Sequence, residues 1–227
     1  FALNNISAED MFYLSSAKTL LSMFKGSPLY QEISDVIDFV TDTQMHNQSD
    51  ILNRIAVPPT PKVVIDESAW KEILSAIKQN KVLEFDYNGR WNTNTTHRKV
   101  HPYQILLDEG MYYLFGYAEE RKDERLFCLN RMKNLTVTNE SFTLPQNYDF
   151  TSRCGGGKFG SFMTDQIETY VIDFYGDARQ YVKDCIWADD QEITENNDED
   201  TTSITFSSSQ SLKVREWVLA QGMNTKP

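Results

Sequence analysis

Arginine and tyrosine residues of this sequence have the types and spacing needed to bind an anionic ring compound. Arg125 and Arg131 follow the aromatic stretch MYYLFGYA at 111–118, and Arg98 lies in HRKVHP, on a neighbouring predicted strand. Guanidinium groups bind phosphate through paired hydrogen bonds, and aromatic faces stack beneath bases. We therefore predict a site able to hold a nucleotide, with Arg98, Tyr112, Tyr113, Arg125 and Arg131 as candidate residues.

Strand alternation divides the aromatic side chains between two faces of a predicted sheet. Tyr112 and Leu114 lie on one face of segment 111–118, and Tyr113, Phe115 and Tyr117 lie on the other. One face of such a sheet must form the core, so most of these aromatic residues are structural. Only one or two tyrosines then remain available to a ligand.

The same alternation places Arg125 on one face with Phe127 and Leu129, and extends that face to Arg131. An alternative without a ligand pairs the arginines with acidic residues such as Glu84 or Asp86. The sequence leaves both interpretations open.

Residues able to carry out catalysis or hold a metal do not form a recognisable set. No G-x-S-x-G motif occurs, and no cysteine has a histidine nearby that could act as its base. The histidines, His46, His97 and His101, are too scattered to suggest metal ligation. We therefore predict no enzyme activity, no catalytic residue, no metal and no cofactor.

The charge of the chain limits where a nucleic acid could bind. The net charge is −11, which argues against nucleic-acid binding by the whole surface. Residues 70–140, however, carry 11 basic and 10 acidic side chains, and they contain the arginines discussed above. The 3 cysteines favour reduced thiols in the cytoplasm, and no apolar run is long enough for a membrane span.

The order of predicted elements indicates an α+β protein with three parts. Residues 1–60 read as helical, with Ser7 and Asp10 forming a capping box, and we expect this segment to serve as a linker and in dimerisation. A helix beginning at Asp66 or Ser68 and about five antiparallel strands follow in 66–140, which suggests a small Sm-like or SH3-like barrel. After a linker at 141–165, residues 166–227 read as a ferredoxin-like α+β domain.

An ordered set of motifs resembles the WYL domain, which is named after a Trp-Tyr-Leu triplet. The set comprises Tyr87, Arg98 to Pro102, Gly110 to Leu114 and the Arg125 to Arg131 pair, with Tyr112 in place of the tryptophan. Residues 166–227 are similar to the C-terminal extension called WCX, through WADDQE at 187–192 and VREWVLAQG at 214–222.

This resemblance implies a bacterial transcription regulator whose WYL domain senses a single-stranded nucleic acid or nucleotide-like effector. It also implies a homodimer, and a helix-turn-helix that binds operator DNA. No such motif is visible here, so we expect the DNA-reading part to lie outside this chain. The alternative is a protein-interaction module whose arginines bind an acidic peptide or partner protein.

Overall fold

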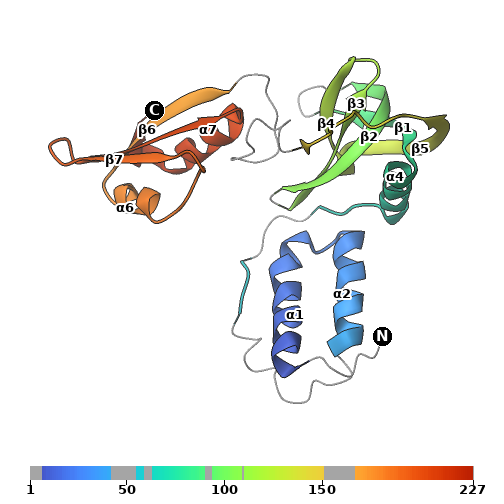
Figure 1. Cartoon of the computed structure of the whole chain (residues 1–227), viewed down its shortest axis with the longest axis horizontal. Helices are drawn as coiled ribbons and strands as arrows, with labels where there is room; N and C mark the ends of the chain where they lie inside the picture. Colours follow the sequence, from blue (N-terminus) through green and yellow to red (C-terminus); the bar gives the residue numbers. More distant parts are fainter. Residues whose placement is uncertain are drawn as a thin grey trace. The chain divides into compact units, whose positions relative to one another are not determined.

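A computed structural model describes residues 7–41, 55–58, 63–89, 94–108, 110–150 and 167–226. The chain divides into two compact units, Phe1–Leu144 and Pro145–Pro227. Each unit combines helices with an antiparallel sheet, which confirms the α+β class (Figure 1). The predicted linker lies largely outside the described residues, because 151–166 are not among them.

The first unit begins with two helices, α1 (Ala8–Leu20) and α2 (Pro28–Thr41), joined through the 3₁₀ helix η2 (Leu21–Phe24). The predicted capping box is present at the start of α1: the Asp10 backbone N–H donates to Ser7 Oγ, and the Ser7 N–H donates to the Asp10 carboxylate. The Ser7 hydroxyl also donates to the Asp10 carboxylate at 2.7 Å, and this bond together with that from the Ser7 N–H lowers the pKa of Asp10. An ion pair of 2.6 Å between Lys18 and Asp38 joins the two helices.

Helix α4 (Glu67–Gln79) begins where the sequence predicted, because the Asp66 side chain accepts a hydrogen bond from the Ala69 N–H. It ends at Asn80, whose φ of 50° is left-handed, a conformation that asparagine tolerates. Its apolar face, which includes Trp70, packs into the core of the unit.

Five strands follow α4, as the alternation of the sequence predicted. They are β1 (Lys81–Asn88), β2 (Thr95–Asp108), β3 (Met111–Ala118), β4 (Asp123–Cys128) and β5 (Met132–Ser141). All neighbouring pairs are antiparallel, in the order β4-β3-β2-β1-β5. Within the described residues β4 and β5 stay unpaired with each other at the two edges. The closed barrel that we expected is therefore not found.

The open sheet is nevertheless strongly curved. The rings of Phe85 in β1 and Phe127 in β4 lie 5.3 Å apart, although two strands separate β1 from β4. Gly116 permits part of this curvature, because a Cβ at this position would lie 2.2 Å from the carbonyl oxygen of His101 in β2. A register shift between Pro102 and Gln104 marks a bulge near the same point.

The concave side of the sheet holds the core of the first unit. Helix α4 and part of the N-terminal helical segment cover it. The buried members of the core are Ile65, Trp70, Ile73, Ala76, Leu83, Phe85, Val100, Tyr112, Leu114, Ala118, Phe127 and Leu129. Burial of these side chains is the main stabilising contribution to the unit.

The second unit has the predicted order strand, helix, strand, strand, helix. These are β6 (Glu168–Tyr175), α6 (Ala178–Lys183), β7 (Glu192–Asn196), β8 (Thr201–Ser208) and α7 (Ser211–Ala220). The 3₁₀ helix η4 (Gly222–Asn224) and a short strand β9 (Thr225–Lys226) follow, and the antiparallel sheet has the order β7-β8-β6-β9. The core includes Phe174 and Phe206, with Trp217 packed against it.

Candidate functional site

Tyr87 lies at the centre of the candidate site and brings two distant strands together. It stands near the end of β1, and its hydroxyl oxygen accepts a hydrogen bond of 3.0 Å from the backbone N–H of Cys128 in β4. Its ring meets Phe127 edge-on, with the centroids 5.2 Å apart. The phenol group is therefore held against the chain that leads into Arg131.

Arg131 lies close to three weakly acidic groups, from Tyr87, Tyr113 and Cys128. Burial raises the pKa of each of these groups, and the positive charge of Arg131 opposes that rise in each. The pKa of Tyr113 rises to about 12, with Cys128 and Asp108 adding to the effect of burial. Tyr113 and Cys128 also face each other as register partners on β3 and β4.

The raised pKa values of Tyr87, Tyr113 and Cys128 determine the protonation state of the site. The two phenols and the thiol stay neutral near pH 7, because each pKa lies above its ordinary value. They provide hydroxyl and thiol groups able to form hydrogen bonds around a guanidinium cation. Such a combination suits an anionic ligand with an aromatic part, because the cation attracts the anion and the phenol rings offer stacking surfaces.

Arg98 extends the positive charge along the same face of the sheet. It is the register partner of Phe85, whereas Tyr87 pairs with Thr96, so Arg98 and Tyr87 are diagonal neighbours. Diagonal neighbours in an antiparallel pair are about 7–8 Å apart. Arg98 is partly exposed, and its side chain makes no hydrogen bond or ion pair with any residue that the structure describes.

Arg125 differs from the other two arginines because it already has an anionic partner. Its guanidinium pairs with Asp123 and donates to the carbonyl oxygen of Glu124 at 2.8 Å. Both charged side chains are about half exposed, at 51% and 48%. Its positive charge is therefore partly neutralised before any ligand binds.

The predicted face shared by Arg125 and Arg131 is wrong, because the strand does not continue that far. Strand β4 ends at Cys128, and a 3₁₀ helix, η3 (Leu129–Arg131), separates it from β5. This turn of helix interrupts the alternation. Arg131 therefore reaches the tyrosines from η3 and not from a strand.

Tyr112 occupies the core and not the ligand site. It is 1% exposed, and the rings of Phe24 and Trp70 each meet it edge-on with centroids 5.7 Å away. Its hydroxyl donates a hydrogen bond of 2.5 Å to Ser27 Oγ, at the start of α2. The structure thus separates two neighbouring tyrosines, because Tyr112 faces the helices and Tyr113 faces Cys128.

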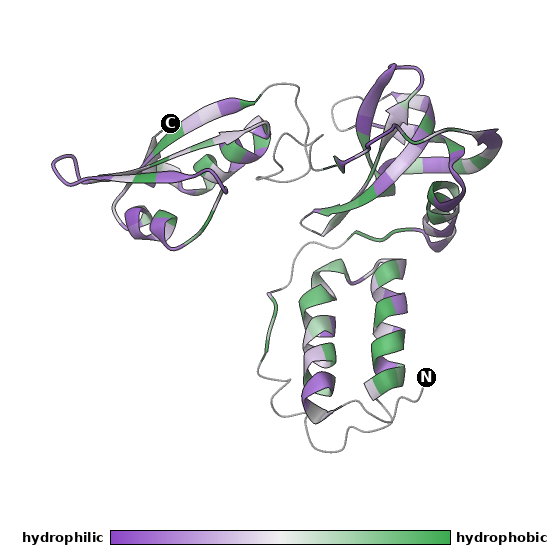
Figure 2. Cartoon of the chain, viewed as in Figure 1, coloured by the Kyte–Doolittle hydropathy of each residue, from purple (hydrophilic) through white to green (hydrophobic). Residues whose placement is uncertain are grey.

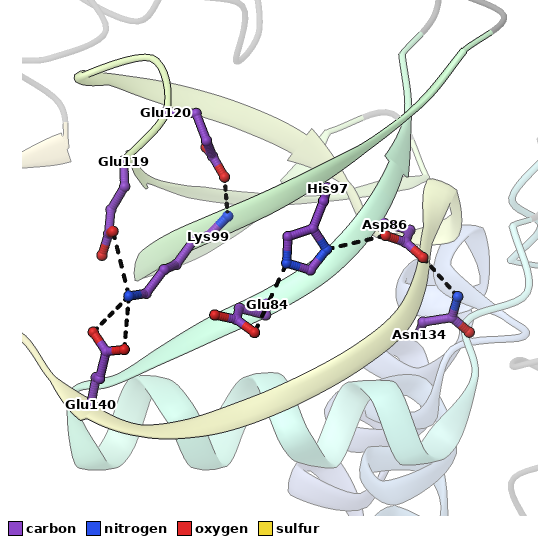
Figure 3. Close-up of polar contacts among 8 residues, drawn as sticks. All are labelled: Glu84, Asp86, His97, Lys99, Glu119, Glu120, Asn134 and Glu140. Carbon is purple, nitrogen blue, oxygen red and sulfur yellow. Dashed lines mark hydrogen bonds and ion pairs between the residues drawn. The ribbon is translucent and has the colours of Figure 1, made fainter.

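The acidic residues proposed as partners for the arginines have other partners (Figure 3). Asp86 Oδ1 lies 3.2 Å from His97 Nδ1, and the amide of Asn134 donates to Asp86 Oδ2 at 2.8 Å. Glu84 lies 3.9 Å from the other ring nitrogen of His97. These contacts lie between β1, β2 and β5, and within the described residues neither carboxylate pairs with Arg98 or Arg131.

Cys128 is the neighbour of the site that sequence reasoning missed. Its Sγ donates to the side-chain oxygen of Asn130 at 2.7 Å, and its N–H holds Tyr87. Its position beside Tyr113 follows from the register between β3 and β4, which the sequence alone does not give. Among the described residues no group of histidine, cysteine and acidic side chains could hold a metal, and no helix is long and apolar enough to span a membrane.

Comparison with known proteins agrees with the pattern of motifs around this site. Residues 68–137 match the family model described as the WYL domain. The chain contains a WYL domain. The match spans α4 except its first residue, all of β1 to β4 and most of β5, and so includes every residue of the candidate site. The resemblance of this part of the chain to the WYL domain is thereby confirmed.

One curated relative is the uncharacterized HTH-type transcriptional regulator YobV of Bacillus subtilis (strain 168), which is 28% identical over 148 residues. The match covers 59% of this chain and 44% of YobV, so the chain spans less than half of its relative.

Two solved structures are also similar to this chain over nearly its whole length. Proteasome accessory factor B/C (PafBC) of Arthrobacter aurescens matches with 15% identity and a TM-score of 0.42, over 95% of this chain and 30% of that protein. A CRISPR Cas-related protein matches with 11% identity and a TM-score of 0.46, over 99% of this chain and 77% of that protein.

Proposed function

We propose that this chain is the effector-sensing part of a WYL-type transcriptional regulator. Its WYL domain binds a single-stranded nucleic acid or a nucleotide-like ligand, with Arg98 and Arg131 on phosphates and Tyr87 and Tyr113 against the bases. Arg125 contributes less, because Asp123 already pairs with it. Binding changes the affinity of a helix-turn-helix outside this chain for operator DNA, by favouring one of two arrangements of the protein.

The observation that carries this proposal is the position of Arg131 beside Tyr87 and Tyr113. A cation next to two neutral phenols matches a ligand that joins negative charge to an aromatic ring. The regulatory role draws support from the family match and from the relative described as an HTH-type transcriptional regulator.

The remaining parts of the proposal concern assembly and location. We propose a cytoplasmic homodimer in which the helical segment and the second unit contribute to dimerisation. The second unit is proposed to be ferredoxin-like, a reading supported by its strand order β7-β8-β6-β9. No enzyme activity, metal or cofactor is part of this function.

A polarisation titration with a fluorescent single-stranded oligonucleotide tests the proposal. Replacing Arg131 by alanine removes the cation near the two phenols, and we expect affinity to fall by about tenfold or more, since hydrogen bonds to charged groups contribute about 1.5–3 kcal/mol. Arg98→Ala should have a similar effect. Arg121→Ala is the matched control, because it removes the same charge from the exposed turn that joins β3 to β4.

Equal weakening by Arg121→Ala and Arg131→Ala would reduce the interaction to general electrostatic attraction and contradict the site. The contrary result is an acidic peptide that displaces the oligonucleotide and binds with higher affinity than the oligonucleotide does. That result would favour the protein-interaction alternative, since carboxylates can pair with the same arginines.

A further inference from the structure

The outward side of α2 is a second surface of the first unit, separate from the candidate site around Tyr87 and Arg131. Its exposed residues follow helical spacing, with Glu32 and Asp35 in the first half and Val36 and Phe39 in the second. Phe39 is 69% exposed and Val36 is 64% exposed. Much of α2 is coloured as hydrophobic in Figure 2. We call these four residues the α2 stripe.

The inward side of α2 combines apolar with small polar residues, whereas the stripe combines apolar with charged ones. The buried residues of α2 are Ser34, Ile37 and Thr41, and Ser34 Oγ has no hydrogen-bond partner among the described residues. Val36 and Phe39 lie about one turn apart on the outward side, so they form an exposed apolar patch next to the two carboxylates.

A pocket of about 410 Å³ continues the stripe toward the start of α2. Glu32 and Asp35 line it from α2, and Glu67 lines it from the first turn of α4. Lys25 also lines the pocket, and Lys71 pairs with Glu67, but the three carboxylates outnumber these two cations. The negative charge of the pocket would attract a basic side chain.

We propose that the α2 stripe and its pocket bind a basic amphipathic helix of a partner. Apolar side chains of that helix pack on Val36 and Phe39, and a lysine or arginine enters the pocket between Glu32, Asp35 and Glu67. Charge complementarity selects this occupant. A second copy of the same stripe would bring like carboxylates together, so the dimerisation proposed above for the helical segment uses surfaces other than this stripe. An anionic ligand is disfavoured for the same reason.

Two synthetic peptides test this proposal on the whole 227-residue chain. Both are amphipathic helices with the same leucines, and one carries lysine and the other glutamate at its polar positions. We expect the lysine peptide to bind and the glutamate peptide not to bind, as measured by fluorescence polarisation. Phe39→Ser should weaken binding of the lysine peptide by about thirtyfold, the effect of losing a central aromatic contact.

Charge reversal gives the sharper result. The pair Glu32→Lys and Asp35→Lys should abolish binding of the lysine peptide and allow the glutamate peptide to bind. Asp198→Lys with Glu199→Lys is the matched control, because it reverses two exposed acidic residues in the turn between β7 and β8. Tyr13→Ser controls for the loss of an exposed aromatic residue, since Tyr13 is 59% exposed on α1.

The outcomes separate the proposal from its rivals. Equal loss of binding in the control reversal would show that the lysine peptide responds only to the net charge of the chain. Unchanged binding by Phe39→Ser would remove the apolar part of the surface. If the unmodified chain forms a dimer and Phe39→Ser abolishes that dimer, the α2 stripe is the surface that binds a second copy of the chain. Each of these results overturns the proposal, and circular dichroism of each variant confirms that it has folded.

Discussion

At the scale of single residues, the two neighbouring tyrosines Tyr112 and Tyr113 have different tasks. Tyr112 links the WYL domain to the helical segment through Ser27, and Tyr113 lies by Cys128 and Arg131. Their side chains point to opposite faces because successive residues of a strand alternate. A ligand that moves β3 would therefore act on both places at once.

The bond between Tyr112 and Ser27 should stabilise the docking of α1 and α2. Tyr112→Phe keeps the ring and removes the hydroxyl that donates to Ser27. A hydrogen bond of this kind contributes about 1 kcal/mol, so amide exchange in α1 and α2 should become about fivefold faster. Hydrogen exchange measured by mass spectrometry follows the effect. Tyr13→Phe, whose hydroxyl bonds the exposed Glu9, is the control, and equal protection in both variants would contradict this role.

Tyr113 makes stability depend on pH in the alkaline range. Its pKa rises from 10.0 to about 12 in the folded protein, so the folded state holds the proton more tightly than the unfolded state. The associated stability is fully present below pH 10 and is lost as pH rises toward about 12. Urea unfolding of the first unit should therefore depend less steeply on pH in Tyr113→Phe than in the unmodified chain. An unchanged pH dependence would show that Tyr113 titrates normally.

Arg125 should matter less to ligand binding than Arg131. Arg125→Ala removes a guanidinium that Asp123 already neutralises in part, so we expect affinity for the oligonucleotide to fall by less than about threefold. The same titration in Asp123→Asn should give slightly tighter binding, because Arg125 is then free of its partner. A loss with Arg125→Ala as large as that with Arg131→Ala would contradict this ranking.

At the scale of elements, local rules of sequence predicted the helices and strands well. The Asp66 cap and the apolar spacing of α4 are local signals, and so is the alternation in β1 and β3. The end of β4 at Cys128 is not visible in that alternation, so the sequence placed Arg131 on the wrong element. The contact between Tyr87 and Cys128 crosses the curved sheet, and no local pattern reports such a contact.

The choice between Tyr112 and Tyr113 as the ligand residue depended on which face the helices cover. That choice is made by packing between segments far apart in the sequence, here Phe24, Ser27 and Trp70 against β3. Sequence reasoning could therefore name the pair of tyrosines without assigning their roles.

The curvature of the sheet should depend on Gly116. In Gly116→Ala the new Cβ would lie 2.2 Å from the carbonyl oxygen of His101, so β2 and β3 must separate. We expect a loss of about 2–4 kcal/mol in the stability of the first unit, of the size found for severe core strain. Thermal unfolding measures it. Gly26→Ala is the control in the same unit, because the atom nearest its new Cβ, the carbonyl oxygen of Val63, lies 3.5 Å away and its φ of +107° opposes the change. A milder effect at Gly116 than at Gly26 would contradict the close approach.

At the scale of the whole molecule, acidic segments precede and follow in sequence a WYL domain that is close to neutral. The chain carries a net charge of −11, so an anionic ligand is repelled except where arginines gather. Binding of phosphate at Arg98 and Arg131 should therefore involve few ionic contacts. The affinity should fall when either of these two arginines is removed. The opposite preference holds at the α2 stripe, where carboxylates favour a basic partner.

The central claim is that Arg98 and Arg131 each neutralise a phosphate of a single-stranded ligand. The most direct test is the slope of log affinity against log salt concentration for a labelled oligonucleotide. Removing two phosphate contacts should make this slope shallower by about 1.4, since each contact on a single strand contributes about 0.7. The account predicts this change in the variant with Arg98→Ala and Arg131→Ala, and no comparable change in Arg121→Ala. A double variant with the slope of the unmodified chain would contradict the account.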